Sequence, residues 1–521
     1  MISALSHLVR LGRAGFVFAR EGVLGLADPA ALPFPAQTAV RLARLVERPS
    51  SDSKRGRLAA AFTRLGPTYV KLGQFLATRP DVVGVNLAHD LESLQDKMAP
   101  FPQAEAEGVV TATLGKPLTD IYAAFGPPVA AASIAQVHRA EVVTPDGRKT
   151  VAVKVLRPNV ERRFRADLEA LTFAATQAEN FSAEARRLRM IEAVSTLRRS
   201  VALEMDLRLE AAALSEMTEN TKADPDFRVP SIDWDRTGKD VLTLEWIDGT
   251  PLYDRAALEA NGFDLKHLSH TVIQTFLRHA LRDGFFHADM HPGNLFVDAS
   301  GTLTFVDFGI MGRLSPKERR FLAEILYGFI TRNYQRVAEV HFEAGYVPAH
   351  HSVENFAQAI RAIGEPIHSR PADEISMAKL LMLLFEVTGL FDMRTRPELL
   401  LLQKTMVVVE GVARSLDPKL DMWTVSEPVV REWMERHLGP AGRIEDAATN
   451  ATNFLAGMPG LMTRGAVLVE QLDAITRDGL VLAPETVAAI GQAEARRGRW
   501  MTAALWVIAA LLAWAIWLLL R

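Results

Sequence analysis

The order of apolar and polar residues divides the chain into helical and strand-like regions. Residues 1–120 carry apolar side chains at helical spacing, most clearly from Leu58 to Leu76, where Gly66-Pro67 interrupts the pattern. Residues 160–220 are again helical in pattern and rich in Ala, Leu, Arg and Glu. From Ser315 to about residue 495 the pattern is mostly helical. We therefore expect helices at the beginning of the chain and again after its middle part.

Short strand-like runs lie between these helical regions. Ile134–Val143 and Thr150–Val155 flank the turn Pro145-Asp146-Gly147, which predicts a hairpin. Val241–Ile247 has the composition of a buried strand, and residues 265–284 form a helical pattern. Further short strands are expected at residues 295–297 and 303–306. Strands grouped between helices predict an α+β fold.

Two polar segments beside the last strands carry the candidate chemistry. His287-Ala288-Asp289-Met290-His291-Pro292-Gly293-Asn294 is followed by Asp307-Phe308-Gly309. Asn294 follows Asp289 by five positions, and Asp307 follows it by eighteen. This spacing resembles that of the catalytic loop and the metal-binding segment of kinases. Mg²⁺ prefers oxygen ligands. Asn294 and Asp307 are therefore expected to hold Mg²⁺, and Asp289 to orient an attacking hydroxyl or water.

A lysine within a strand of β-branched residues is a candidate ligand for nucleotide phosphates. Val151–Val155 contains Lys154 and resembles the kinase strand whose lysine contacts the α- and β-phosphates. Such a lysine needs a carboxylate partner, and Glu210 is the preferred one, four residues after Asp206 on the same helix face. The catalytic residues expected are Asp289, Lys154 and Glu210.

An alanine-rich segment stands where a kinase has its glycine-rich loop. Glycine permits close approach of the backbone to phosphate, and alanine permits less of it, while Ser133 adds a hydroxyl. The connecting strand over 241–247 is expected to add two nucleotide contacts. The predicted nucleotide-binding residues are Ala130, Ala131, Ala132, Ser133, Lys154, Glu245, Ile247, Asn294 and Asp307.

Four segments together resemble the UbiB (ADCK-like) family of atypical kinases. They are the alanine-rich loop, the HxDxHPGN loop, the segment 67–74 with a KxGQ signature, and Glu204-Met205-Asp206 with an ExD motif. The resemblance runs from about Arg64 to Leu314 in the family's order. Met290 departs from the usual Pro, and Ala213 from a frequent Asn. The resemblance implies a bilobal protein-kinase-like fold with a helical extension at its N-terminal side.

The resemblance also implies a regulatory contact. Glu204 and Asp206 would meet Lys71 and Gln74, and the KxGQ helix would lie over the active site, where a protein kinase admits a peptide. The pattern around Lys71 and Gln74, considered alone, favours a solvated helix face. After Asp307 the chain turns almost directly into helix, without a long activation segment. This argues against protein substrates and favours ATP hydrolysis or transfer to a small or lipid-like acceptor.

The same resemblance implies that the protein would support ubiquinone biosynthesis, with ATP and Mg²⁺ as cofactors. Its expected partners are quinone-pathway enzymes or polyprenyl-phenol lipids, and a homodimer is possible. Two alternatives remain open, a choline- or aminoglycoside-kinase-like phosphotransferase and a nucleotide-binding pseudokinase scaffold. The KxGQ segment counts against the first. The complete set Lys154, Asp289, Asn294 and Asp307 counts against the second.

Composition narrows the function further. The 521 residues carry a net charge of -3 without a long block of one sign, which does not suggest nucleic-acid binding. Cysteine is absent, which excludes disulfides and thiolate metal sites. His287 and His291 have a spacing found in metal sites, but no further nitrogen or sulfur ligands lie nearby in sequence. His287 is instead expected to brace the backbone of the catalytic loop.

The C-terminal segment predicts a membrane anchor. Met501–Leu520 is uncharged, and 20 residues at about 1.5 Å per residue span a bilayer core of ~30 Å. Arg496, Arg497 and Arg499 precede it, and the positive-inside rule places the body in the cytoplasm. We expect a single span in a bacterial inner membrane. An arginine-rich start makes a mitochondrial inner membrane the less favoured alternative.

These observations predict five regions. They are a helical extension with the KxGQ motif (1–120), a kinase-like N-lobe (121–249), a kinase-like C-lobe (250–345), a helical region (346–499) and a transmembrane anchor (500–521).

Overall fold

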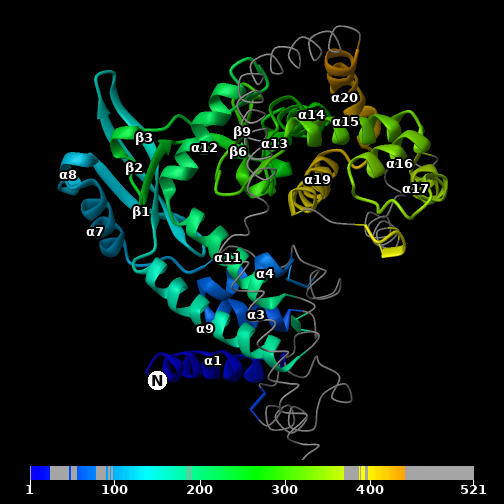
Figure 1. Cartoon of the computed structure of the whole chain (residues 1–521). Coiled ribbons are helices and arrows are strands. Elements are labelled where there is room, and N and C mark those ends of the chain that lie inside the picture. Colours follow the sequence, from blue (N-terminus) through cyan, green and yellow to red (C-terminus); the bar gives the residue numbers. More distant parts are fainter. Residues whose placement is uncertain are drawn as a thin grey trace, which may run out of the picture. The chain divides into compact units, whose positions relative to one another are not determined.

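The computed structural model of the chain describes most of residues 2–439 (Figure 1). The described ranges are 2–23, 46–47, 56–77, 90–91, 94, 98–182, 185–186, 189–368, 387, 389–393 and 397–439. Met1–Met434 forms one compact unit and Glu435–Arg521 another, and the features that follow lie in the first apart from the end of the helix Met422–Leu438. Among the described residues, no helix combines the length and apolar character needed to cross a bilayer. The predicted anchor at 500–521 lies outside the described residues.

An antiparallel sheet forms the N-lobe. Its strands have the order β1-β2-β3-β5, and β2 pairs with β3 along its whole length as the hairpin pattern predicts. Val151, Val153 and Val155 of β3 face a buried apolar cluster with Ala106 and Val110 of α7. Since side chains alternate along a strand, Lys154 faces the opposite side. The elements are α7 (Gln103–Leu114), α8 (Leu118–Ile121), β1 (Ala124–Ala131), β2 (Ala135–Thr144), β3 (Gly147–Leu156) and β5 (Val241–Glu245).

The KxGQ segment lies on a helix of the N-terminal extension. Gly66, with φ of 105°, ends one helix and Pro67 begins the next, so the predicted interruption is confirmed. Phe62, Leu65 and Tyr69 pack in a buried cluster between these helices. A Cβ on Gly73 would lie 2.3 Å from Leu94 Cδ1, so close packing requires glycine there. The helices are α1 (Ile2–Arg20), α3 (Arg57–Leu65) and α4 (Pro67–Ala77).

The helical pattern over 160–220 is divided into separate helices, and Glu204 and Asp206 belong to different ones. Glu204 is the last residue of one helix, whereas Asp206 caps the next by accepting a hydrogen bond from the backbone N–H of Arg208. An aspartate side chain at this position satisfies a free N–H of the first turn, which favours a new helix start. The helices are α9 (Val160–Phe181), α11 (Met190–Glu204) and α12 (Leu207–Asn220).

The C-lobe is built around α14 (Leu265–Arg278), which runs into a π-helical turn at His279–Asp283. The predicted strands at 295–297 and 303–306 are present as β8 and β9, within a sheet of order β4-β9-β8-β6, and β7 pairs with β10. The short elements are β4 (Phe227–Arg228), η3 (Trp234–Arg236), β6 (Gly249–Pro251), α13 (Arg255–Ala260), β7 (Phe285–His287), η5 (Pro292–Asn294), β8 (Leu295–Asp298), β9 (Leu303–Phe305) and β10 (Met311–Arg313).

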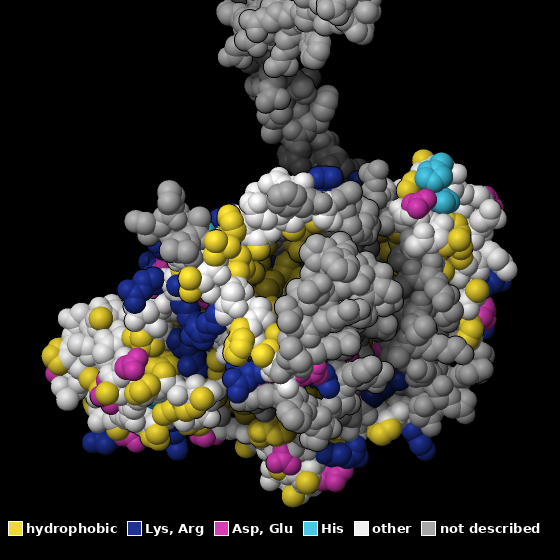
Figure 2. Space-filling model, turned by 90° about the horizontal axis from the view of Figure 1, so that it is seen from below, with side chains coloured by type: hydrophobic (Ala, Val, Ile, Leu, Met, Phe, Trp, Pro, Cys, Tyr) yellow, Lys and Arg dark blue, Asp and Glu magenta, His cyan; other side chains and the backbone are white. Residues whose placement is uncertain are grey.

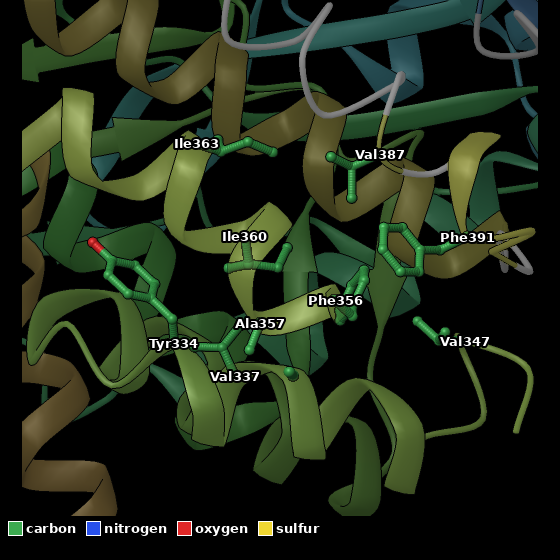
Figure 3. Packing of buried hydrophobic residues seen from close by; sticks show 10 residues of the cluster. Tyr334, Val337, Val347, Phe356, Ala357, Ile360, Ile363, Val387 and Phe391 are labelled. Carbon is green, nitrogen blue, oxygen red and sulfur yellow. The ribbon is translucent and has the colours of Figure 1, made fainter. Parts of the chain in front are cut away.

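Helices follow the C-lobe, as the pattern after Ser315 predicts. Ser315 and Glu318 form a capping box at the start of the first, with Pro316 at its first position. Buried apolar residues including Tyr334, Phe356 and Phe391 make a core among these helices (Figure 3). The helices are α15 (Pro316–Ile330), α16 (Tyr334–Glu343), α17 (Val353–His368), α19 (Pro397–Leu416) and α20 (Met422–Leu438).

Candidate active site

Lys154 joins the two lobes through two carboxylates. Its Nζ lies 2.9 Å from Glu210 Oε1 on α12 and 2.8 Å from Asp307 Oδ1, directly after β9 and Val306. The side chains of Lys154 and Glu210 are 13% and 6% exposed. The predicted pairing of Lys154 with Glu210 is therefore present, and Asp307 is a second partner that the sequence spacing did not indicate.

The charges at this site support one another. Burial alone would lower the pKa of Lys154, but the carboxylates of Asp307 and Glu210 outweigh it and raise that pKa. For Asp307, burial acts to raise the pKa, and the ammonium of Lys154 outweighs it, so the pKa falls to about 2. Burial raises the pKa of Glu210 against the attraction of Lys154. Lys154 and Asp307 therefore form an ion pair at neutral pH.

His287 braces the catalytic loop as expected. Its Nε2 donates to the backbone carbonyl of Asp307 at 2.9 Å, and its Nδ1 accepts from the backbone N–H of Asp289 at 3.1 Å. This pair of bonds requires a neutral imidazole with its proton on Nε2. Burial lowers the pKa of His287, which favours that form. One side chain thus connects the two segments that carry the candidate Mg²⁺ ligands and the candidate catalytic carboxylate.

The orientation of Asn294 suits a metal ligand. Its amide Nδ2 donates to the backbone carbonyl of Asp289 at 3.1 Å, which leaves the amide oxygen available. The backbone N–H of Val306 donates to the carbonyl of Asn294 at 3.0 Å and brings Asp307 beside it. Asp307 adopts a left-handed backbone conformation with φ of 62°. An amide oxygen and a carboxylate on adjacent segments fit a Mg²⁺ ion that is shared with phosphate oxygens.

The alanine-rich segment differs from our prediction of a loop. Ala130 and Ala131 belong to β1 and pair with Val137 and Gln136 of β2. Only residues 132–134 form the turn, and Ser133 is buried there. Because alanine accepts extended backbone geometry more readily than glycine, the sheet continues further toward the turn. The nucleotide contacts predicted for these residues stay predictions.

Glu245 and Ile247 lie at the end of β5. The strand ends at Glu245, so Ile247 lies beyond it. The Glu245 carboxylate accepts hydrogen bonds from Arg228 Nη1 at 3.0 Å and from the backbone N–H of Ser231 at 3.1 Å. The carboxylate of Glu245 is therefore bound to residues in and just after β4. Its contact with nucleotide remains a prediction.

The regulatory contact implied by the resemblance is present in part. Lys71 Nζ of α4 lies 2.6 Å from Glu204 Oε2 of α11, and the two side chains are 10% and 13% exposed. The solvated face that the local pattern favours for Lys71 is therefore wrong. Asp206 binds the guanidinium of Arg208 at 2.6 Å in place of the KxGQ helix, because its capping position turns it toward α12. Gln74 lies one turn beyond Lys71 on α4, and it is half-buried.

A second titratable group lies apart from this site. Histidine side chains stand beside an acidic one on the face shown in Figure 2, and His350, His351 and Asp392 form such a group. Asp392 Oδ2 lies 3.2 Å from His351 Nε2 and 3.6 Å from His350 Nε2. With His350 and Asp392 two-thirds exposed, solvated side chains in hydrogen-bonding contact account for the arrangement.

Two further residues support the site and were not predicted. Arg157, just after β3, donates to the backbone carbonyl of Ala132 in the alanine-rich turn. The hydroxyl of Thr405 on α19 lies 3.1 Å from the backbone carbonyl oxygen of Ala288 and 2.8 Å from that of Leu401, and its single hydrogen is shared between the two. For Arg157, the position directly after the strand that carries Lys154 is a local signal in the sequence. The contact of Thr405 with Ala288 joins residues 117 positions apart, and no sequence pattern indicates it.

Comparison with known proteins defines the class. The family model described as "ABC1 atypical kinase-like domain" matches residues 93–341, and that described as "UbiB helical domain" matches residues 360–421. The first match contains Lys154, Glu210, Asp289, Asn294 and Asp307. The α+β body with its paired lysine and its HxDxHPGN loop is therefore an atypical kinase-like domain, followed by a helical domain.

Similar proteins narrow the class to one family. "Probable protein kinase UbiB" of Marinobacter nauticus is 39% identical over 461 residues, 87% of this chain and 84% of the relative. The protein with the same description in Azotobacter vinelandii is 39% identical over 430 residues, 81% and 79% of the two chains. This chain belongs to the UbiB family of atypical kinases. Among solved structures, "The complex structure of Rv3197-erythromycin from Mycobacterium tuberculosis" is 24% identical, with a TM-score of 0.48, and covers 69% of this chain and 90% of that one.

Proposed function

We propose that this chain binds Mg²⁺-ATP and either hydrolyses it or transfers its γ-phosphoryl group, in support of ubiquinone biosynthesis. The observation that carries the proposal is the contact of Lys154 with both Glu210 and Asp307, beside Asp289 and Asn294. A buried lysine with two carboxylates is costly to maintain without a use for its charge. Phosphate oxygens are a ligand that would use it.

Each side chain then has a defined task. Asp307 would hold Mg²⁺, while Glu210 keeps the ammonium of Lys154 in place. Asn294 offers its amide oxygen to the same ion, because its nitrogen is occupied by Asp289. When bound, Mg²⁺ would supply positive charge to the phosphate oxygens. Asp289 orients the attacking hydroxyl or water and accepts its proton.

The short segment after Asp307 supports a non-peptide acceptor. The chain passes from Asp307 into β10, which pairs with β7, and α15 begins at Pro316. These residues are all described, and they contain no extended platform for a peptide. The Lys71–Glu204 pair additionally ties the KxGQ helix to the kinase-like domain. We therefore assign the acceptor to water, a small molecule or a lipid-like intermediate.

A membrane location is part of the proposal. Met501–Leu520 would cross a bacterial inner membrane once, and Arg496, Arg497 and Arg499 would keep the catalytic body in the cytoplasm. Polyprenyl-phenol intermediates partition into the same membrane because of their apolar chains. The candidate partners are such lipids or the enzymes that modify them.

Quinone profiling tests the proposal. A strain without this protein is complemented with the wild type, with Asp289→Asn, or with Asp146→Asn, which removes an exposed carboxylate on the hairpin turn. We expect ubiquinone to fall in the deletion strain, to recover with the wild type and Asp146→Asn, and to stay low with Asp289→Asn. Normal ubiquinone in the deletion strain would refute the pathway assignment. Recovery with Asp289→Asn would refute the role of the catalytic carboxylate.

A further inference from the structure

Arg157 connects the end of β3 to the alanine-rich turn. Its guanidinium donates to the backbone carbonyl of Ala132 from Nε at 3.0 Å and from Nη2 at 2.8 Å, and Nη2 also donates to the carbonyl of Ala99 at 2.9 Å. Its backbone N–H donates to the carbonyl of Ile134 at 2.8 Å. The guanidinium carbon lies 5.5 Å from the ring centre of Phe101. One residue thus contacts both ends of the turn and the segment before α7.

The turn is anchored by neighbouring bonds as well. The backbone N–H of Met98 donates to the carbonyl of Ala131 at 3.1 Å, and that of Ala132 to the carbonyl of Ala135 at 2.8 Å. Gln136 exchanges hydrogen bonds with the backbone of Phe101, at 2.9 Å and 3.3 Å. The carbonyls of residues 131, 132 and 134 therefore all accept hydrogen bonds from outside the turn or across it.

The turn lies next to the candidate nucleotide lysine. In the β2–β3 register, Val137 is opposite Lys154 and Ala135 is opposite Leu156. The turn at 132–134 directly precedes Ala135, so it lies next to the residue pair at which β3 ends. Arg157 follows that end directly, so a single short stretch of chain carries both the phosphate ligand Lys154 and the anchor of the turn.

We infer that Arg157 is a positioning residue that clamps the alanine-rich turn, so that nucleotide phosphates meet an ordered backbone. This inference rests on the proposed function. A loop that is already ordered loses less conformational freedom when a ligand binds, which strengthens binding. The planar guanidinium supplies several donors in one plane and can serve two carbonyls at once. A lysine at this position would supply one ammonium and no fork.

Two measurements on the full-length protein in detergent test the clamp. Calorimetric titration with Mg²⁺-ATP gives the nucleotide Kd, and hydrogen exchange without nucleotide gives the protection of amides 132–135. We compare wild type with Arg157→Gln, Arg157→Lys and the control Arg148→Gln, which alters an exposed arginine at the other end of β3. We expect Arg157→Gln to raise Kd by about 3- to 10-fold and to speed exchange in the turn. Arg157→Lys should lie between it and wild type, and Arg148→Gln should match wild type.

The outcomes separate this inference from the proposed function. Unchanged exchange in the turn of Arg157→Gln, or nucleotide binding as tight as or tighter than wild type, would overturn the clamp. If wild type itself binds no nucleotide, the proposed function fails, and faster exchange in Arg157→Gln would still support the clamp. Should Arg157→Gln not fold, as judged by its thermal unfolding, Arg157→Lys provides the same comparison.

Discussion

Two buried lysine–glutamate pairs connect different parts of this molecule. Lys154–Glu210 joins β3 to α12 within the kinase-like domain, and Lys71–Glu204 joins α4 of the helical extension to α11. Both lysine side chains are about one-tenth exposed, and their glutamates lie on successive helices that meet at Asp206. The geometry of the pairs is similar. Their surroundings differ.

The two pairs differ in how close they lie to the predicted metal site. Lys154 also binds Asp307, a candidate Mg²⁺ ligand. Lys71 pairs with a glutamate outside the predicted metal site, and its charge helps to lower the pKa of Asp307 from a distance. The first pair therefore lies in the candidate active site, and the second holds the KxGQ helix against the kinase-like domain.

The largest expected effect is on turnover at the first pair. Lys154→Met removes the phosphate ligand and the partner of Asp307, and ATP turnover should fall by about 10²- to 10³-fold. The measurement is steady-state phosphate release at saturating ATP. Lys149→Met changes an exposed lysine on the same strand and should retain wild-type turnover. Equal turnover in Lys154→Met and wild type would contradict the assignment of this lysine.

The second pair should affect stability more than chemistry. Lys71→Met leaves Glu204 buried without its cation, which costs roughly 3–5 kcal/mol of unfolding free energy for a buried pair. Urea unfolding measures the loss. In the double variant Lys71→Met, Glu204→Met much of it should return, because two apolar side chains replace the pair.

Arg148→Gln is the control for an exposed pair, since Arg148 and Glu141 are largely solvated and should contribute little. If Lys71→Met is no less stable than Arg148→Gln, then the Lys71–Glu204 contact is not a buried structural pair. That result would remove the contrast between the two regions.

A smaller effect is expected where the helical domain reaches the catalytic loop. Thr405→Val keeps the shape of the side chain and removes the hydroxyl hydrogen that the carbonyls of Ala288 and Leu401 share, at a cost of about 1 kcal/mol. Thermal unfolding and ATP turnover should both decline slightly. Thr405→Ser retains the hydroxyl and should recover part of the turnover. A variant indistinguishable from wild type in both measurements would show that α19 does not support the loop through this contact.

The smallest effect near neutral pH is expected from His138 in the N-lobe. Burial lowers its pKa from 6.5, and its ring donates from Nδ1 to the carbonyl of Gly126 and accepts from Gln136 at Nε2, which requires the neutral form. Below pH 6.5 the unfolded chain binds more protons at this histidine than the folded protein does, so the unfolding free energy should fall as pH decreases.

Urea unfolding between pH 7.5 and 5.5 measures this dependence. In His138→Gln the side chain cannot be protonated, and the decrease below pH 6.5 should be shallower than in wild type. An identical slope in both proteins would mean that His138 does not contribute.

Local patterns predicted much of the fold. The hairpin around Gly147, the helix boundary at Gly66-Pro67 and the strands after Asn294 follow from turn residues and apolar alternation, which act over a few residues. The strands β4, β6, β7 and β10 have two or three residues each, too few to show a period. The division of α11 from α12 depends on one capping side chain, Asp206, inside a continuous helical composition.

The site was predictable where its residues stand in recognisable local motifs. Spacing alone indicated Asp289, Asn294 and Asp307. Lys71 and Glu204 are 133 positions apart, and the resemblance to a family indicated their contact where local pattern indicated solvent. Residues such as Thr405, which act through long-range packing, have no local signal at all.

The most direct test of the account is ATP turnover by the full-length protein in detergent, with wild type compared with Asp307→Asn and the exposed control Asp146→Asn. Asparagine at 307 keeps the size of the side chain and removes the charge that binds Lys154 and would bind Mg²⁺. We expect Mg²⁺-dependent turnover in wild type and Asp146→Asn and its loss in Asp307→Asn. Equal turnover in all three proteins would contradict a phosphoryl-transfer site at this position.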